Sequence, residues 1–208
     1  MTFVLGLTGS IGMGKSATAG MFRALGVPVW DADAAVHTLY RGAAAPLVEE
    51  AFPGTVTDGV VDRARLGPVV LGDPAALKRL EAIVHPLVRQ NEEEFLAAAM
   101  ARRSRLILLD IPLLFETGGA GRTDAVAVVS APAEVQRARV LARAGMSEQK
   151  LDAILAKQMP DAQKRRRAHF LVDSGSGFAR AEADVQAIVR ALAGRPGRRL
   201  AGQVPRSP

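Results

Sequence analysis

The chain has 208 residues, of which 49% are hydrophobic, and this is typical of one domain with a full core and, at most, an inserted subdomain. It contains no cysteine, so disulfides and thiolate metal sites are excluded. The formal net charge of +6 suggests nucleic acid as a partner, but aromatic residues amount to only 4% and provide little surface for stacking bases.

The first predicted elements are a buried strand at 3–8, a glycine-rich turn and a helix at 16–25. The turn, Gly9-Ser10-Ile11-Gly12-Met13-Gly14-Lys15-Ser16, fits the pattern G-x-x-x-x-G-K-[ST] in the strand–turn–helix context that the pattern requires. Its backbone N–H groups and the start of the helix favour phosphate. Lys15 can reach the β- and γ-phosphates, and the Ser16 hydroxyl can ligate Mg²⁺. The turn therefore predicts binding of a nucleoside triphosphate, with ATP expected.

Two carboxylates, Asp31 and Asp33, follow the second predicted strand at 27–30. Transfer of a phosphoryl group to an alcohol needs a group that orients the hydroxyl or takes its proton, and aspartate does this in many kinases. Asp33 is the predicted catalytic carboxylate, with Asp31 beside it. Aspartate also caps helices, so one or both could cap the helix expected to begin near Ala34.

The segment 32–104 is predicted to be mostly helical and to be broken into short helices by turn residues such as Asp58-Gly59 and Asp73-Pro74. This is longer than a simple crossover, so an inserted helical subdomain is expected. Its longest helix is predicted at 87–103, because Pro86 suits the first turn of a helix. A lone histidine such as His85 is more often structural than functional, and no two histidines have metal-ligand spacing.

A third strand, at 106–110, ends in Asp110, in the form of the second acidic element that holds Mg²⁺ in phosphate-loop enzymes. The segment Ile111-Pro112-Leu113-Leu114-Phe115-Glu116 then places a carboxylate after an apolar patch. The simpler alternative is a buried loop with Glu116 at the surface or capping a helix. Strands at 125–129 and 169–172 complete an α/β fold, a mostly parallel five-stranded sheet flanked by helices.

Three consecutive helices are predicted at 133–144, 147–158 and 160–167, with Ser147 as an N-cap. Arg139 and Arg143 share a helix face. With the basic cluster at 164–167 they predict a mobile lid that neutralises the transferring phosphoryl group and excludes water. A solvated basic face is the alternative.

A loop, Asp173-Ser174-Gly175, leads to a last helix at 179–193, and residues 195–208 are expected to form a disordered basic tail. Four arginines lie in this tail, so the rest of the chain has 27 − 4 = 23 basic against 21 acidic residues, a net charge of +2. Nucleic acid is therefore not expected as the main partner. Neither a signal peptide nor a membrane span is expected, which predicts a cytoplasmic protein.

Taken together, these segments resemble the dephospho-coenzyme A kinase family, a family of phosphate-loop (P-loop) kinases, over about residues 3–190. The resemblance rests on segments that occur in the family's order: the phosphate loop, Val29-Trp30-Asp31-Ala32-Asp33, His85-Pro86, Asp110-Ile111-Pro112-Leu113-Leu114-Phe115-Glu116, Gln136 with Arg139 and Arg143, Ile154-Leu155 with Gln158, and Asp173-Ser174-Gly175. The chain departs from the family at Ala17, where many members have threonine, and in the loop Asp173-Ser174-Gly175, because an asparagine-containing form of that loop is commoner.

The resemblance implies ATP-dependent phosphorylation of the 3′-hydroxyl of the ribose in dephospho-coenzyme A, the last step of coenzyme A synthesis. It implies one P-loop kinase domain over 1–194, with a core at about 1–31, 105–132 and 168–194, a substrate-binding insertion at about 32–104 and a lid at about 133–167. The protein is expected to be a monomer or a small homo-oligomer.

The resemblance also implies roles for individual residues. The implied catalytic residues are Asp33, Lys15, Arg139 and Arg143. Those implied to bind ATP are Gly9, Ser10, Ile11, Gly12, Met13, Gly14, Lys15, Ser16, Ala17, Asp173, Ser174 and Gly175. Those implied on the acceptor side are Asp31, Asp33, His85, Leu113 and Glu116, and the Mg²⁺ ligands are Ser16, Asp110 and Asp33.

Two other functions stay open at this point. Another small-molecule kinase of the same architecture, such as a nucleoside monophosphate kinase, would usually meet its phosphate acceptor with arginines, whereas Asp31 and Asp33 favour a hydroxyl. A GTP-switched regulatory protein would need an Asn-Lys-x-Asp segment. The nearest approach, Gln149-Lys150-Leu151-Asp152, lacks the asparagine.

Overall fold

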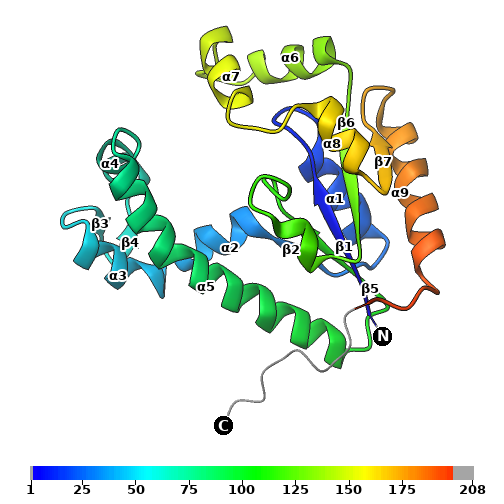
Figure 1. Ribbon diagram of the computed structural model, residues 1–208, viewed down its shortest axis with the longest axis horizontal. Coiled ribbons are helices and arrows are strands. Elements are labelled where there is room, and N and C mark those ends of the chain that lie inside the picture. Colours follow the sequence, from blue (N-terminus) through cyan, green and yellow to red (C-terminus); the bar gives the residue numbers. More distant parts are fainter. Residues whose placement is uncertain (1, 199–208) are drawn as a thin grey trace. The chain divides into compact units, whose positions relative to one another are not determined.

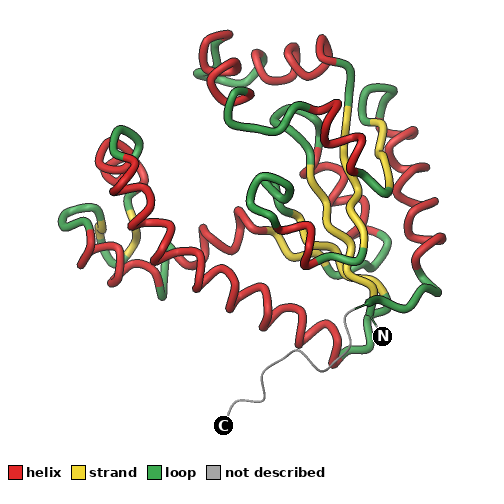
Figure 2. The backbone as a smooth tube through the Cα atoms, in the orientation of Figure 1, coloured by secondary structure: helices red, strands yellow, loops and turns green. Residues whose placement is uncertain are grey.

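A five-stranded sheet in the order β2-β5-β1-β6-β7 forms the centre of the computed structural model, which describes residues 2–198. The pairs β1–β5, β1–β6 and β6–β7 are parallel. The predicted α/β fold class is confirmed. Figure 2 shows the strands of this sheet in yellow. The strands are β1 (Phe3–Thr8), β2 (Val29–Asp31), β5 (Leu106–Asp110), β6 (Ala125–Ser130) and β7 (Phe170–Asp173).

Side chains of β1 point alternately to the two faces of this sheet, so the strand contributes to the packing on both faces. Phe3, Leu5 and Leu7 join one buried cluster with side chains of α1 (Lys15–Ala24) and α9 (Phe178–Leu192). Figure 1 shows these two helices on the same side of the sheet. On the other face a Cβ at Gly6 would lie 2.7 Å from Leu114 Cδ2. Glycine at this position therefore lets the loop after β5 pack directly on β1.

The predicted lid segment contains three helices, α6 (Ala133–Leu141), α7 (Glu148–Leu155) and α8 (Asp161–Arg167). Figure 1 shows α6 and α7 beyond the carboxyl ends of β1 and β6. Ser147 caps α7, since its hydroxyl accepts the Lys150 N–H at 3.3 Å. The helix predicted to reach residue 144 ends earlier, because the chain turns through Arg143, whose N–H donates to Val140 O at 3.0 Å. A short 3₁₀ helix, η1 (Gly119–Arg122), precedes β6.

The chain divides into two compact units, one from Asp31 to Ala98 and one made of the chain before and after it. The first of these contains α2 (Ala32–Leu39), α3 (Ala44–Ala51), α4 (Arg63–Val70) and most of α5 (Pro74–Ala101). It also holds an antiparallel pair that was not predicted, β3 (Val56–Thr57) and β4 (Val60–Val61). Asp58 and Gly59 both have positive φ, 51° and 74°, as a tight hairpin turn requires.

The prediction of a helix that begins after Pro86 is wrong, because α5 is one helix of 28 residues with Pro86 inside it. Asp73 caps its start by accepting the N–H groups of Ala75 and Ala76 at 2.8 and 3.2 Å. Leu80 and Val84 of this helix belong to the buried cluster of their unit. Burial of this apolar face outweighs the hydrogen bond that a proline removes from a helix interior.

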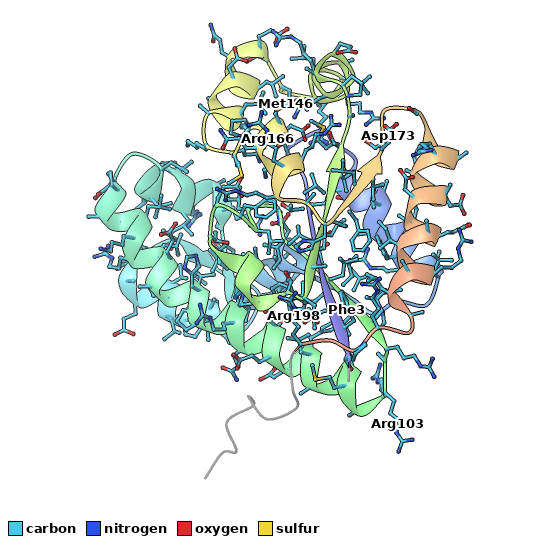
Figure 3. All side chains as sticks on the ribbon, turned by 45° about the vertical axis from the view of Figure 1, so that its right-hand side comes forward. Phe3, Arg103, Met146, Arg166, Asp173 and Arg198 are labelled. Atoms are coloured by element: carbon cyan, nitrogen blue, oxygen red, sulfur yellow. The ribbon has the colours of Figure 1, made fainter. Side chains whose placement is uncertain are left out.

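The last described residues, 195–198, extend from α9 to the amino edge of the sheet. There the Arg198 N–H donates to Asp124 Oδ1 at 2.6 Å, and Asp124 Oδ2 accepts the Val4 N–H at 2.7 Å. Figure 3 shows Arg198 near Phe3, at the opposite end of the sheet from Asp173. The rest of the predicted tail, 199–208, lies outside the described residues. Between residues 2 and 198, no helix is both long and apolar enough to cross a membrane.

Candidate active site at the phosphate loop

The phosphate loop, residues 9–16, joins the carboxyl end of β1 to α1. Gly12 and Gly14 have φ of 78° and 83°, which glycine adopts without strain, and Gly14 is the N-cap of α1. A Cβ at Gly12 would lie 2.5 Å from Val140 Cγ2, so α6 packs directly on the loop. The loop thus presents backbone N–H groups at a helix N-terminus, where a phosphate binds favourably.

An ion pair lies beside this loop. Lys15 Nζ is 2.8 Å from Asp110 Oδ1, and the side chains are 13% and 1% exposed. β5 ends at Asp110 next to β1, so the sheet itself brings the carboxylate to the loop. The structure therefore brings together the predicted phosphate-binding lysine and a predicted Mg²⁺ ligand.

The oxygen donors at this edge fit Mg²⁺. Ser16 is exposed in the first turn of α1, and Asp110 ends β5. No group of three His, Cys, Asp or Glu side chains that could hold a metal ion occurs within residues 2–198. Mg²⁺ in kinase sites is usually held through one or two carboxylates and completes its shell with substrate phosphates and water, so such a group is not needed.

The loop after β7 is tied to the phosphate loop through Ser174. Its hydroxyl donates to Met13 O at 2.7 Å. Arg139 donates to Ser174 Oγ at 3.1 Å and to Ser174 O at 2.7 Å. The predicted lid arginine thus lies at the phosphate loop and links α6 to the end of β7.

Asp173 and Gly175 shape the same loop. The Asp173 carboxylate accepts the Ser176 hydroxyl at 2.6 Å and the Gly175 and Ser176 N–H groups at 2.8 and 3.2 Å. These bonds, above all that from the Ser176 hydroxyl, lower the pKa of Asp173. A Cβ at Gly175 would lie 2.4 Å from Pro132 Cδ, so only glycine lets the loop pass so close to the start of α6. Contact of these residues with adenine stays a prediction.

A cavity of about 300 Å³ opens beside the phosphate loop, with mainly apolar walls. Arg143 lies beyond the end of α6 but still lines this cavity together with Arg139. Phe178, which is 75% exposed at the start of α9, also lines this cavity and was not among the predicted residues. An aromatic residue directly after a glycine-rich loop was the available signal. The lining residues are Gly12, Gly14, Ala17, Thr18, Met21, Arg139, Arg143, Ser174, Gly177, Phe178 and Ala181.

Glu116 makes its contacts within the unit that holds the phosphate loop. Its Oε1 lies 2.9 Å from Lys164 Nζ and accepts the Met159 N–H at 2.7 Å. Burial would raise the pKa of Glu116, but the hydrogen bonds from Lys164 and Met159 outweigh it and the pKa is lowered. The Lys164 side chain is fully buried, so the prediction that it contributes charge to a basic lid surface is wrong for this residue.

A family model described as dephospho-CoA kinase matches residues 3–179 of the chain. The dephospho-CoA kinase of Mesorhizobium japonicum is 66% identical over 93% of this chain and 98% of its own length. The dephospho-CoA kinase of Rhodopseudomonas palustris is 56% identical over 94% of this chain and 98% of its own length. The chain belongs to the dephospho-CoA kinase family. A solved structure, TT1252 from Thermus thermophilus, has a TM-score of 0.81 and 37% identity, covering 91% of this chain and 97% of that one.

Membership of this family decides between the functions that the sequence left open. The chain is an enzyme of the dephospho-CoA kinase type, with ATP as the phosphoryl donor that the family implies, and the alternative of a nucleoside monophosphate kinase is not supported. The P-loop kinase fold and the role in coenzyme A synthesis follow from the same membership.

The other residues that the family resemblance singles out lie as follows. Asp31 is the N-cap of α2, and its Oδ1 accepts the Ala34 N–H at 3.0 Å, so the helix-capping alternative holds for this residue. Asp33 is exposed in the first turn of α2, and His85 is exposed on α5. Leu113 is 39% exposed in the loop after β5. Their functional roles stay predictions.

Proposed function

We propose that the chain transfers the γ-phosphoryl group of ATP to the 3′-hydroxyl of the ribose of dephospho-coenzyme A, in the cytoplasm. The observation that carries this proposal is the Lys15–Asp110 pair, at 2.8 Å, beside a glycine loop that begins a helix. A cation held there can neutralise the negative charge that develops on the β-phosphate oxygens when the bond from the bridging oxygen to the γ-phosphorus breaks.

The donor occupies the phosphate loop and the adjoining cavity. Loop N–H groups, the amino end of α1 and Lys15 bind the phosphates. Arg139 and Arg143 face the same cavity and add positive charge to the transferring group. Phe178 and Met21 provide apolar surface for the adenosine, and Asp173, Ser174 and Gly175 shape the loop beside it.

We assign Ser16, Asp110 and Asp33 as the protein oxygens that hold Mg²⁺. An ion held by these oxygens would neutralise part of the charge on the phosphates of ATP. Support comes from the exposed Ser16 hydroxyl in the first turn of α1 and from the Asp110 carboxylate next to Lys15.

Asp33 is the proposed catalytic carboxylate for the acceptor. The 3′-oxygen forms a bond to the γ-phosphorus, the bond from that phosphorus to the bridging oxygen breaks, ADP leaves, and the hydroxyl proton passes to Asp33. Asp33 is suited to this because it follows β2 by two residues and because Asp31, not Asp33, caps α2. Asp31, His85, Leu113 and Glu116 are proposed for the acceptor side.

Product analysis tests the proposal directly. The purified protein is mixed with ATP, Mg²⁺ and dephospho-coenzyme A, and the products are separated by chromatography. Equal amounts of ADP and coenzyme A are expected, with a new phosphate on the 3′-oxygen. Faster ADP formation with a nucleoside monophosphate as acceptor would overturn the assignment.

The cavity gives a further expectation for the donor. Phe178→Ala should raise KM for ATP about tenfold, because stacking of a base on an aromatic ring contributes on the order of 1–3 kcal/mol, while kcat stays close to wild type. Steady-state kinetics with varied ATP measure both constants. Leu171→Ala is the control, because Leu171 is also exposed, at 44%, but does not line the cavity. An unchanged KM for ATP in Phe178→Ala would show that the adenosine does not contact Phe178.

A further inference from the structure

One residue of the phosphate loop, Ile11, has both of its backbone polar groups bound by side chains of the lid segment. The Ile11 N–H donates to Gln158 Oε1 at 3.1 Å. The Ile11 carbonyl accepts from Gln136 Nε2 at 2.7 Å. The two glutamines come from different parts of the lid, since Gln136 lies on α6 and Gln158 lies between α7 and α8.

The orientation of each side-chain amide follows from its partner. A backbone N–H can only donate and a carbonyl can only accept, so Gln158 presents its oxygen and Gln136 its nitrogen. Gln158 therefore acts as an acceptor through its amide oxygen, whereas Gln136 acts as a donor through its amide nitrogen. This difference makes the contacts separable by substitution.

Both glutamines are held in place by further contacts. Gln136 is 7% exposed, and a Cβ at Gly12 would lie 3.0 Å from its carbonyl oxygen, so its backbone presses on the loop as well. Gln158 is followed by Met159, whose N–H donates to Glu116 at 2.7 Å. Two hydrogen bonds, made by the consecutive residues Gln158 and Met159, therefore connect Ile11 to Glu116 in the loop after β5.

We propose that Gln136 and Gln158 form a latch that holds the phosphate loop in the conformation that binds the donor, so that ATP binding depends on the seating of the lid segment. The proposal rests on the proposed function, because it assigns the phosphate loop to ATP. Both are positioning residues that act through Ile11. Hydrogen bonds to both the N–H and the carbonyl of one residue restrict its rotation and so hold the backbone of the loop at that residue.

Replacement of the side-chain amide of either glutamine by an apolar group tests the latch. Gln136→Leu and Gln158→Leu should each raise KM for ATP about fivefold, the equivalent of one neutral hydrogen bond, with kcat and KM for dephospho-coenzyme A within about twofold of wild type. The double variant should show less than the product of the two effects, because both bonds hold the same residue. Gln149→Leu, an exposed glutamine on α7, is the control that should change nothing.

Glutamate at each position gives the sharper readout. Gln158→Glu keeps an oxygen facing the Ile11 N–H and should stay within about twofold of wild type in KM for ATP. Gln136→Glu places a carboxylate oxygen against the Ile11 carbonyl and should be worse than Gln136→Leu. Equal damage by both glutamates would indicate added negative charge alone and overturn the latch.

Lys15→Ala separates failure of the latch from failure of the proposed function. Binding of ATP is measured by calorimetry on the full chain, with thermal unfolding of each variant recorded alongside. If Lys15→Ala weakens ATP binding and neither leucine variant does, the latch is wrong and the phosphate-loop assignment stands. If wild type and Lys15→Ala bind ATP equally, the assignment of the loop itself is wrong.

Discussion

Asp33→Asn should lose at least about 99% of kcat while the protein still binds ATP. Asparagine has the shape of aspartate and still offers an oxygen to the acceptor hydroxyl, but it cannot take the proton that leaves when the 3′-oxygen bonds to phosphorus. Removal of a positioned general base costs about 10²–10⁴-fold in rate. The measurement is steady-state kinetics with both substrates varied, together with calorimetric titration of ATP.

Asp31→Asn is the matched control for this prediction. Asparagine caps helices as well as aspartate does, so the bond from the Ala34 N–H is kept while one negative charge is removed two positions from Asp33. We expect less than a tenfold loss of kcat in Asp31→Asn. Near-normal turnover in Asp33→Asn would remove Asp33 from the mechanism, and a larger loss in Asp31→Asn would transfer the role to Asp31.

Lys15→Ala should change the kinetic constants in a different way from Asp33→Asn. Loss of the ammonium removes charge from the phosphates in both the bound and the transition state, so KM for ATP rises and kcat falls together. It also removes the ammonium that lies 2.8 Å from the buried Asp110 carboxylate. The two variants therefore separate the chemistry of the acceptor from binding of the donor.

The centre of the site could be predicted because it depends on residues that are close in sequence. The phosphate loop is eight consecutive residues whose glycines permit positive φ at residues 12 and 14. Asp110 could be placed at the same edge of the sheet as the phosphate loop because the carboxyl ends of parallel strands meet at one edge, and the structure then shows β5 paired directly with β1. Local pattern and one rule of sheet topology were sufficient there.

The features that were not predicted, or were predicted wrongly, depend on packing between residues that are distant in sequence. Lys164 stands among arginines in a run that resembles a solvated helix face, and only the fold brings Glu116 to it. Pro86 is tolerated inside α5 because that helix buries Leu80 and Val84 with α3, which a local rule for proline does not include. The hairpin at 56–61 was available in principle, since Asp58-Gly59 is a known turn signal, but each strand has only two residues.

Glu116→Gln should destabilise the fold by about 3 kcal/mol at neutral pH, because it leaves the fully buried Lys164 without its anionic partner. The effect should depend on pH with a definite sign. The pKa of Glu116 is lowered in the folded protein, so its carboxylate stabilises the fold above the unfolded pKa, and this contribution is lost as the pH falls through the folded value. Urea unfolding of wild type and Glu116→Gln, at pH 7 and at several values below 5, measures the difference.

The destabilisation of Glu116→Gln relative to wild type should therefore shrink as the pH falls, because protonated Glu116 and glutamine are both neutral. The control is Glu148→Gln, which makes the same change in the Arg137–Glu148 pair on α6 and α7, where both side chains are 50% exposed. That variant should differ from wild type by less than about 1 kcal/mol at neutral pH. In the double variant Glu116→Gln/Lys164→Met much of the lost stability should return, because no buried charge is left unpaired. A difference between Glu116→Gln and wild type that stays constant down to pH 3 would mean that the ion pair is not the source of the effect, and that shape or hydrogen bonding at residue 116 is.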